Sequence, residues 1–487
     1  MNGSTRRRYA PPLLVGVAFS VLALSWAVTN PPFASPDEPA HYLRSLAVGG
    51  LSLAGNIEVD APAGLWTTRD PACNKFLPEQ SASCLDDLVT TDQEVTTDSA
   101  AGLYPPLAYL LPGALARLES NPEDADRAGR LALVAISSIF FVLAALLLWS
   151  PEAGYVSLVG LVVAVTPMVV FVSSMLNNSA LETAAGLAFA AAIIRLARPG
   201  GPRPWVWVVA ASSGALLTVA RTTGILWMTF GVALYCILVG VSGLREELRR
   251  NRASILGVAI VLIAAAGANR AWEATYGTDV AQEGPLAYPW RDKIGEAFSR
   301  LPRLGAEWIG KFGWLDTSLP KAAVLAWLGV GAAMVALALV LGRARQRLAL
   351  LVALALAVAV AVILSATLRA GELGGNVQAR HLMPFLVVIP LLAGEMVTQR
   401  ATRWRNVGIA LAILVCFTTT VQFVAWYLNA RRQSVGVDGS LFFLADPDWE
   451  PPLGWPFWLV VTIGALALLL ASAVIDARDR RSRPRLD

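Results

Sequence analysis

Long apolar segments recur along the whole chain, separated by connections that are alternately short and basic or long and acidic. A helix needs about 20 consecutive apolar residues to cross a bilayer. Averaging over windows of roughly 19 residues gives twelve candidate spans: 11–29, 129–149, 154–174, 179–196, 204–220, 223–241, 253–270, 322–342, 348–367, 382–398, 406–428 and 454–475. The pattern predicts an all-α polytopic protein whose residues 1–487 form one integral membrane domain.

Arginines concentrate in every second connection. Six short segments hold 21 of the 39 basic residues: 6–8, 195–203, 245–252, 343–347, 400–405 and 478–485. Short basic loops mark the cytoplasmic side of a membrane. We therefore expect a multi-pass membrane protein with both termini in the cytoplasm. The first apolar run is long for a cleaved signal peptide, so we expect it to remain as a span.

The long connections are expected on the outer side. They are residues 30–128, 271–321, 368–381 and 429–453, and they carry most of the acidic residues. The first of them is too long for a simple connector and is expected to contain helices of its own. Cys73 and Cys84 both lie in it, in a compartment that permits disulfides, which favours a bridge over two free thiols.

Composition supports this class of protein. Hydrophobic residues make up 56% of the chain and charged residues 15%, whereas soluble domains average about 45–50% and about 25%. The sequence has no P-loop, HExxH or CxxC motif, and we expect no nucleic acid among its partners. There are only two histidines, His41 and His381, so the surroundings of each are informative.

The segment that follows the first span carries the clearest chemical pattern. Ser35 is a predicted helix N-cap, followed by Pro36 and by Asp37 and Glu38 in the first turn. In such a helix Asp37 and His41 share one face. Acidic residues that complement a helix dipole explain the carboxylates, but they do not explain a histidine one turn later at the membrane boundary.

These residues resemble motifs of known enzymes. The pattern Asp37-Glu38-x-x-His41-Tyr42 resembles the Asp-Glu-x-x-His-aromatic motif of protein O-mannosyltransferases and, more broadly, the first-loop acidic motif of GT-C glycosyltransferases. Tyr104-Pro105-Pro106-Leu107 resembles the Pro-Pro-Leu segment of those enzymes and of aminoarabinose transferases, with Tyr104 in place of their His or Lys.

The wider layout is similar to a bacterial family of predicted membrane proteins with no assigned function. That similarity adds Asn177-Asn178 and Arg380-His381-Leu-Met-Pro384, which opens a late span, to the motifs of the first loop. We find no second acidic motif after the third span.

The resemblance to GT-C enzymes implies a GT-C-like helical fold and the transfer of a sugar from a polyprenyl-phosphate donor. The acceptor would be a cell-envelope glycan, lipid or protein, membrane lipid would be a further partner, and the location would be the bacterial cytoplasmic membrane. Asp37 is the candidate base. Glu38 and His41 are expected to orient it or to help hold a divalent cation, and the resemblance does not decide whether a metal is used.

The leaving phosphate requires cations, for which arginine is well suited. Arg221, Arg369 and Arg380 lie at outer ends of spans, and Arg380-His381 is the best pair; snorkelling to lipid head groups is the alternative explanation for each arginine. Tyr104, Pro105, Pro106, Asn178 and Glu182 are the candidate substrate-lining residues. Glu182 lies one turn inside a span, as a functional carboxylate or as the partner of Ser179 in a capping box.

Two other functions remain open at this point. Twelve spans are also common in transporters and lipid-linked saccharide flippases, and broken helices at matching positions in two halves would favour that class. A non-catalytic assembly protein is the third possibility.

Overall fold

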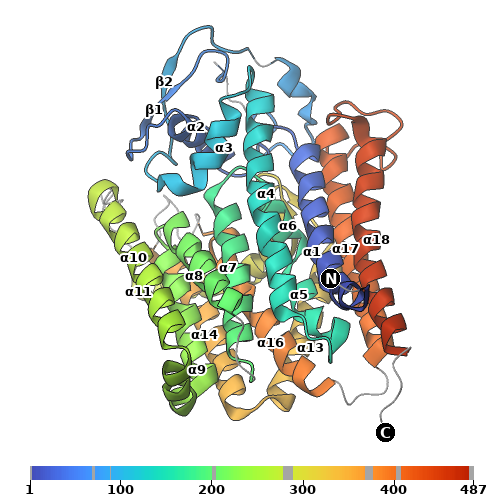
Figure 1. Cartoon of the computed structure of the whole chain (residues 1–487). Coiled ribbons are helices and arrows are strands. Elements are labelled where there is room, and N and C mark those ends of the chain that lie inside the picture. Colours follow the sequence, from blue (N-terminus) through green and yellow to red (C-terminus); the bar gives the residue numbers. More distant parts are fainter. Residues whose placement is uncertain are drawn as a thin grey trace.

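A bundle of long helices dominates the computed structural model of the chain, which describes residues 3–67, 72–87, 89–199, 204–277, 289–367, 377–401 and 407–481 (Figure 1). Within these residues nine helices are long and apolar enough to cross a membrane. They are α1 (Gly3–Thr29), α4 (Pro122–Leu148), α7 (Asn178–Leu196), α9 (Gly224–Arg250), α10 (Arg252–Tyr276), α13 (Lys321–Leu341), α14 (Ala344–Thr367), α17 (Val407–Val435) and α18 (Gly454–Arg481). The predicted all-α polytopic class is confirmed.

The remaining three predicted spans are shorter or broken. Span 204–220 forms the apolar helix α8 (Pro204–Ala220), which has only 17 residues. Span 154–174 divides into η3 (Gly154–Leu158), α5 (Val159–Ala164) and α6 (Pro167–Val172). Pro167 starts a new helix because it lacks an N–H, and the Thr166 hydroxyl caps that helix by accepting from Val169 N. Span 382–398 similarly divides into α15 (Met383–Leu386) and α16 (Val388–Ala401).

The broken spans lie inside the bundle, where other helices cover their backbone. Residues 153–172 are buried throughout, as interrupted helices at membrane depth must be. Gly160 of α5 and Gly394 of α16 allow the two backbones to touch, because a Cβ on Gly160 would lie 2.6 Å from the Pro390 carbonyl oxygen. Close packing through small residues is typical of membrane helices.

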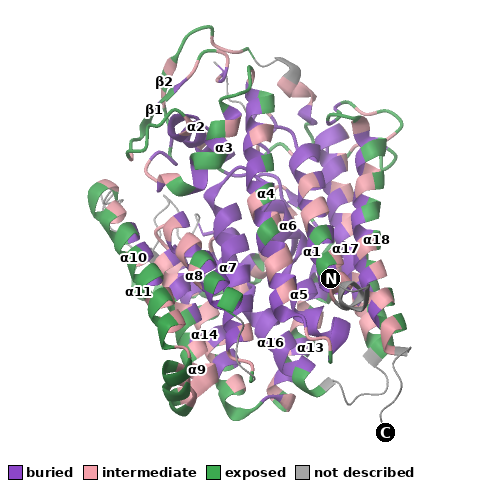
Figure 2. Cartoon of the chain, viewed as in Figure 1, coloured by how far each residue is buried: buried purple, intermediate pink, exposed green. Residues whose placement is uncertain are grey.

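Helix α7 is the centre of the bundle. In its most apolar window 94% of the residues are buried, against 17% in α10 and in α13. Figure 2 shows α7 mostly buried and α10, at the edge of the bundle, mostly exposed or intermediate. Apolar residues around the periphery are expected where lipid replaces water as the solvent.

The connections gather at two opposite ends of the bundle. At the large-loop end, drawn uppermost in Figure 1, residues 30–67, 72–87, 89–121, 301–320, 377–381 and 436–453 meet through contacts such as Trp314 Nε1 to the Phe33 carbonyl (3.0 Å) and Val437 N to the Pro78 carbonyl (2.9 Å). At the short-loop end, residues 149–155, 195–199, 342–347, 395–399 and 476–480 meet, for example through Arg198 and Glu395. This division agrees with the two sets of connections that the arginine pattern separates.

The large-loop end contains small helices and strands. They are α2 (Glu38–Gly49), η1 (Ala82–Asp87), η2 (Pro106–Tyr109), α3 (Leu110–Ala116), α12 (Leu301–Gly310) and η5 (Ala379–His381), with two antiparallel pairs, β1 (Glu58–Ala61) with β2 (Val95–Asp98) and β3 (Lys311–Phe312) with β4 (Thr317–Ser318). Helix α11 (Trp290–Ser299) lies lower, against the middle of α14. The predicted helices of the first loop are therefore present, and the strand pairs are additional.

The predicted disulfide is present in this region. The Cα atoms of Cys73 and Cys84 are 6.2 Å apart, within the range that a bridge allows. Arg432 of α17 holds the bridged loop by donating to the Asn74, Leu77 and Gln80 carbonyls and to the Asp316 carboxylate. The loop is thereby fixed to the membrane bundle.

Candidate functional site

A tight turn joins α1 to α2 and presents Asp37. The helix begins at Glu38, and Asp37 is its N-cap in the left-handed region, at φ 64°. The prediction of Ser35 as the N-cap is wrong: its hydroxyl has no hydrogen-bond partner in the described part of the chain, while its carbonyl accepts from Glu38 N (3.2 Å). A left-handed residue other than glycine costs free energy and persists only where its surroundings enforce it. The turn directs the consecutive carboxylates of Asp37 and Glu38 to different sides of the chain.

Asp37 points outward into a group of charged and aromatic side chains, which we name the Asp37 cluster. Arg380 of η5 donates to its carboxylate and also to the Pro36 carbonyl (2.6 Å). The Asp37 side chain remains 57% exposed. Burial alone would raise the pKa of Asp37, but the charges of Arg380, His41 and Arg221 outweigh it and lower that pKa below its ordinary value. The cluster consists of Asp37, His41, Tyr104, Tyr109, Arg221, Arg380 and His381.

His41 lies one helical turn after Asp37, as predicted, between two tyrosine rings. Its ring is stacked on Tyr104 at 5.7 Å and on Tyr109 at 5.9 Å, and its Nδ1 is 2.7 Å from the Tyr109 hydroxyl. Burial lowers the pKa of His41 to about 3, against the opposing effect of Asp37. The imidazole is therefore neutral near pH 7 and can serve as a hydrogen-bonding group beside the carboxylate.

Arg221 occupies the short turn between α8 and α9 and faces the same group. Its guanidinium carbon is 5.6 Å from the centre of the Tyr104 ring, and its Nη2 is 3.4 Å from the Tyr104 hydroxyl. Asn269 of α10 fixes the turn by donating to the carbonyls of Thr218 (2.7 Å) and Arg221 (2.9 Å). Arg221 and Arg380, from distant parts of the chain, thus both lie near the Asp37 carboxylate.

His381 completes the cluster next to Arg380. The Nδ1 atom of His381 accepts from Gln378 N at 3.4 Å, which fixes η5. Burial lowers the pKa of His381 well below its ordinary value, and the charges of Arg221, Arg380 and His41 lower it further. Both histidines therefore stay neutral beside the two arginines. Arg369, the third predicted phosphate-binding arginine, lies outside the described residues.

Glu182 and Asn178 lie beneath the Arg221 turn. Of the two alternatives for Glu182, the capping box with Ser179 is wrong, because Asn177 caps α7 by accepting from Ala180 N (2.9 Å). Glu182 is buried and accepts instead from the Thr223 hydroxyl (3.1 Å) and Trp227 Nε1 (3.0 Å). Its Oε2 atom has no hydrogen-bond partner among the residues that the structure describes. The side chain of Asn178 donates to the Ala220 carbonyl at 3.4 Å.

The Pro-Pro-Leu segment borders a separate apolar recess next to the cluster. Pro105, Pro106 and Leu107 line it together with Asn269 and Trp272 of α10, and its volume is about 260 Å³. Tyr104, the residue before this segment, turns toward His41 and Arg221. The segment therefore adjoins both the charged cluster and an apolar surface.

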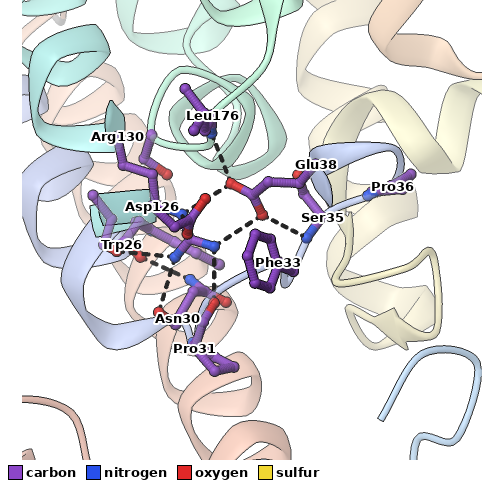
Figure 3. Close-up of polar contacts among 12 residues, drawn as sticks. Trp26, Asn30, Pro31, Phe33, Ser35, Pro36, Glu38, Asp126, Arg130 and Leu176 are labelled. Atoms are coloured by element: carbon purple, nitrogen blue, oxygen red, sulfur yellow. Dashed lines mark hydrogen bonds and ion pairs between the residues drawn. The ribbon is translucent and has the colours of Figure 1, made fainter. Parts of the chain in front are cut away.

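Glu38 is not part of the Asp37 cluster, contrary to the expectation that it would orient Asp37 or help hold a cation. It points inward and accepts from Arg130 Nε (2.9 Å) and Nη2 (2.8 Å), from Ser35 N (3.0 Å) and from Leu176 N (2.7 Å) (Figure 3). Arg130 of α4 also donates to three carbonyls at the end of α1 and just after it, those of Ala27, Asn30 and Pro31.

A second carboxylate adjoins this pair. Asp126, four residues before Arg130 on α4, lies 2.9 Å from Arg130 Nε (Figure 3). The three side chains of this network, which we name the Glu38 network, are at most 1% exposed. Arg130 and Asp126 were not among the predicted site residues, although an arginine at the start of a predicted span is a signal of a functional or structural charge.

The described residues contain no group of three or more His, Cys, Asp and Glu side chains arranged to hold a metal ion. The predicted set of Asp37, Glu38 and His41 does not form one, because Glu38 turns away. Of the three residues in that set, only Asp37, with its carboxylate, and His41, with its imidazole, face the Asp37 cluster.

The fold and the site together define a polytopic α-helical membrane protein with a cationic and aromatic cluster around one carboxylate at the large-loop end. The chain belongs to a family described as "Predicted membrane protein (DUF2142)", which matches residues 19–389. This confirms the resemblance to a family of predicted membrane proteins without an assigned function. No curated protein and no solved structure shows a significant match.

Proposed function

We propose that this protein is a glycosyltransferase that uses a polyprenyl-phosphate sugar at the outer face of the bacterial cytoplasmic membrane. One observation carries the proposal. An outward-facing carboxylate, Asp37, shares a cluster with Arg380 and Arg221 at the end of a membrane bundle. A lipid-linked donor keeps its tail in the bilayer, so its phosphate must react at such a boundary.

The proposed reaction assigns a role to each group. Asp37 takes the proton of the acceptor hydroxyl, whose oxygen then forms a bond to the anomeric carbon of the sugar. The bond from that carbon to the phosphate oxygen breaks, and its electron pair remains on the polyprenyl phosphate. Arg380 and Arg221 stabilise this phosphate, and neutral His41 and His381 are hydrogen-bonding groups that do not compete for it. The proton is finally released from Asp37 to solvent.

The remaining predicted residues take supporting roles in this proposal. Pro105 and Pro106 contribute to the apolar recess beside Tyr104, where the donor lipid or an apolar part of the acceptor can lie. Glu182 and Asn178 support the Arg221 turn from below. The acceptor is a cell-envelope glycan, lipid or protein.

The proposed orientation follows from the arginine-rich segments. It places the large-loop end outside the cell and both termini in the cytoplasm. Cysteines introduced at Leu441 and Leu248, both exposed and at opposite ends, test it in a background without Cys236 and Cys416. An impermeant thiol reagent applied to intact cells should label only position 441. Labelling of position 248 instead would reverse the orientation.

A transporter or saccharide flippase is the second candidate, and one observation favours it. Two interrupted helices, 154–172 and 379–401, pack against each other in the middle of the bundle. Interrupted helices form the substrate sites of many transporters. Here, however, their backbone is buried against neighbouring helices, and the charged cluster lies at the end of the bundle.

Activity of the Asp37→Asn variant separates the two candidates. Membranes containing wild-type protein are incubated with a panel of radiolabelled polyprenyl-phosphate monosaccharides, and label transferred to envelope material is counted. Asp37→Asn keeps the size of the side chain but removes its basicity, so transfer should fall at least about a hundredfold. Asp98→Asn, an exposed carboxylate on β2, is the matched control and should retain activity. Full transfer by Asp37→Asn would end the enzyme proposal.

A further inference from the structure

A basic recess lies at the short-loop end, on the opposite side of the bundle from the Asp37 cluster. Two adjoining cavities of about 910 and 380 Å³ share Arg198, Arg343, Glu395 and Gln399 as walls. Helices α1, α4, α7, α8 and α16 and the α13–α14 turn surround them. We name the two cavities together the basal recess. The proposed glycosyltransferase chemistry does not use it.

Arginines outnumber acids on its walls. Arg195, Arg198, Arg343 and Arg345 line the basal recess, against Glu152 and Glu395. An anion is therefore the ligand charge that these walls favour. Glu152, on the rim, accepts from the Ser150 hydroxyl at 2.9 Å.

One ion pair forms a rigid and nearly neutral floor. Arg198 donates to both oxygens of Glu395, at 2.8 and 2.6 Å, and also to the Leu148 and Trp149 carbonyls. Gln399 donates to the same Glu395 carboxylate at 3.1 Å. Because Glu395 is neutralised in place, it does not repel a bound anion, and Arg198 keeps one geometry.

The α13–α14 turn supplies the cations that remain available. Arg343 is exposed, and its guanidinium has no protein partner among the described residues, while its backbone N–H donates to Gln346. Arg345 uses only its Nη1, which donates to the Val239 carbonyl at 2.8 Å beside the kink at Gly240. Within the part of the chain that the structure describes, the other donors of both guanidinium groups have no partner and can bind oxygen atoms of a ligand.

The opposite wall is apolar and aromatic. Tyr9, Leu146, Trp149, Trp205 and Val206 line this side, and Trp205 is 37% exposed. Tryptophan and tyrosine favour the depth at which lipid glycerol groups lie. A ligand that fits both walls carries a phosphate at one side and apolar chains at the other, and the volume far exceeds the size of an inorganic phosphate.

We propose that the basal recess binds the head group of an anionic phospholipid from the adjacent leaflet. The phosphate contacts Arg343 and Arg345, and the glycerol and the first part of the acyl chains lie against Trp205 and Tyr9. Basic pockets between transmembrane helices are suited to such head groups. A bound lipid would connect the α13–α14 turn to α7 and α8. The Arg343 side chain makes no such connection by itself, because it has no contact with α7 or α8 among the described residues.

Lipid retention in native mass spectrometry tests this proposal. The full-length protein is purified in detergent and incubated with phosphatidylglycerol or with phosphatidylcholine of the same acyl chains. Wild type should retain phosphatidylglycerol at least about tenfold better. Arg343→Gln, at an exposed side chain, should lose most of that preference, and Arg343→Gln with Arg345→Gln should lose all of it. Arg249→Gln, an exposed arginine of the same end outside the recess, should keep it.

The other outcomes overturn the proposal. Equal retention of both lipids, or an equal loss in Arg249→Gln, would show only a general attraction of the basic surface. Displacement of phosphatidylglycerol by millimolar inorganic phosphate would show that a free phosphate is the ligand. The thermal unfolding temperature of each variant, measured without added lipid, distinguishes loss of the site from loss of folding. If Arg343→Gln keeps both the wild-type unfolding temperature and the wild-type lipid preference, the site is refuted.

Discussion

Asp37 and Glu38 are neighbours in the sequence, yet their surroundings have little in common. The Asp37 side chain is 57% exposed and shares its cluster with arginines, histidines and tyrosines. Glu38 is fully buried and accepts four hydrogen bonds from three different parts of the chain. The left-handed conformation of Asp37 separates the two side chains. One carboxylate is thus left available for chemistry while its neighbour fixes the turn that presents it.

The two regions also differ in how their charges are balanced. In the Asp37 cluster, cations outnumber the exposed carboxylate, which suits an anionic ligand. In the Glu38 network, two carboxylates share the single guanidinium of Arg130 with no access to solvent. An open cationic site can bind and release a ligand, whereas a sealed network of this kind fixes helices in place. The following changes test this division, from the largest expected effect to the smallest.

Arg130→Ala should have the largest effect, on folding. It leaves Glu38 and Asp126 buried without a cation and releases the carbonyls at the end of α1. Removing one partner of a buried pair costs about 3–5 kcal/mol. Urea unfolding in detergent, followed by tryptophan fluorescence, measures the difference. A loss below about 1 kcal/mol would mean that the network does not hold the turn.

Arg380→Gln should weaken donor binding while the fold is retained. Hydrogen bonds to charged groups contribute about 1.5–3 kcal/mol, so the affinity for a polyprenyl phosphate should fall about tenfold to a hundredfold. Binding is measured by isothermal titration in nanodiscs. Arg127→Gln is the control, because Arg127 pairs with Glu123 and Asp124 on the surface of α4. An equal loss in both variants would remove Arg380 from the phosphate site.

The titration of Asp37 should reveal its arginine partner. The pKa of Asp37 in the folded protein is lower than its ordinary value of 3.8, so the ion pair with Arg380 stabilises the fold above about pH 4. That contribution is lost as the pH falls through the lowered pKa. In Arg380→Gln the effect of burial is less opposed, and the pKa should rise. Infrared difference spectra of wild type and of Arg380→Gln, each compared with the same protein carrying Asp37→Asn, measure this shift. An unchanged pKa would contradict the pairing.

Asp126→Asn should have the smallest effect. Among the described residues no side-chain hydrogen bond to Asp126 is formed, and its charge is paired with Arg130. The substitution leaves Glu38 and Arg130 as a one-to-one pair, so the free energy of unfolding should change by less than about 1 kcal/mol. Glu38→Gln removes a carboxylate of the same network that accepts four bonds and should cost more. A larger loss in Asp126→Asn would reverse the ranking of the two carboxylates.

Local patterns in the sequence predicted much of this molecule. The spacing of apolar segments predicted the helices, and the position of Cys73 and Cys84 in one loop predicted their bridge. The pattern from Asp37 to His41, with two arginines at the ends of later spans, predicted residues that the fold brings together. Each of these inferences depends on segment length, on charge, or on residues within one or two turns.

The parts that were missed depend on distant partners. Glu38 and Arg130 are 92 residues apart, and nothing near Glu38 in the sequence shows that it turns inward. The helix was expected to begin at Pro36 with Ser35 as its N-cap, but it begins at Glu38, whose carboxylate is bound by Arg130 and Leu176. The helix break at Thr166 and Pro167 could be predicted from a proline inside an apolar run. The burial of the broken backbone could not, because it depends on packing against the distant helix α16.

A cryo-EM structure of the protein with a bound polyprenyl phosphate tests the central claim most directly. The proposed function places the phosphate within hydrogen-bonding distance of Arg380 or Arg221, with the Asp37 carboxylate facing the position of the sugar and Glu38 still bound to Arg130. Phosphate density away from the Asp37 cluster, or a Glu38 side chain that leaves Arg130 to contact the ligand, would contradict the division of roles between the two carboxylates.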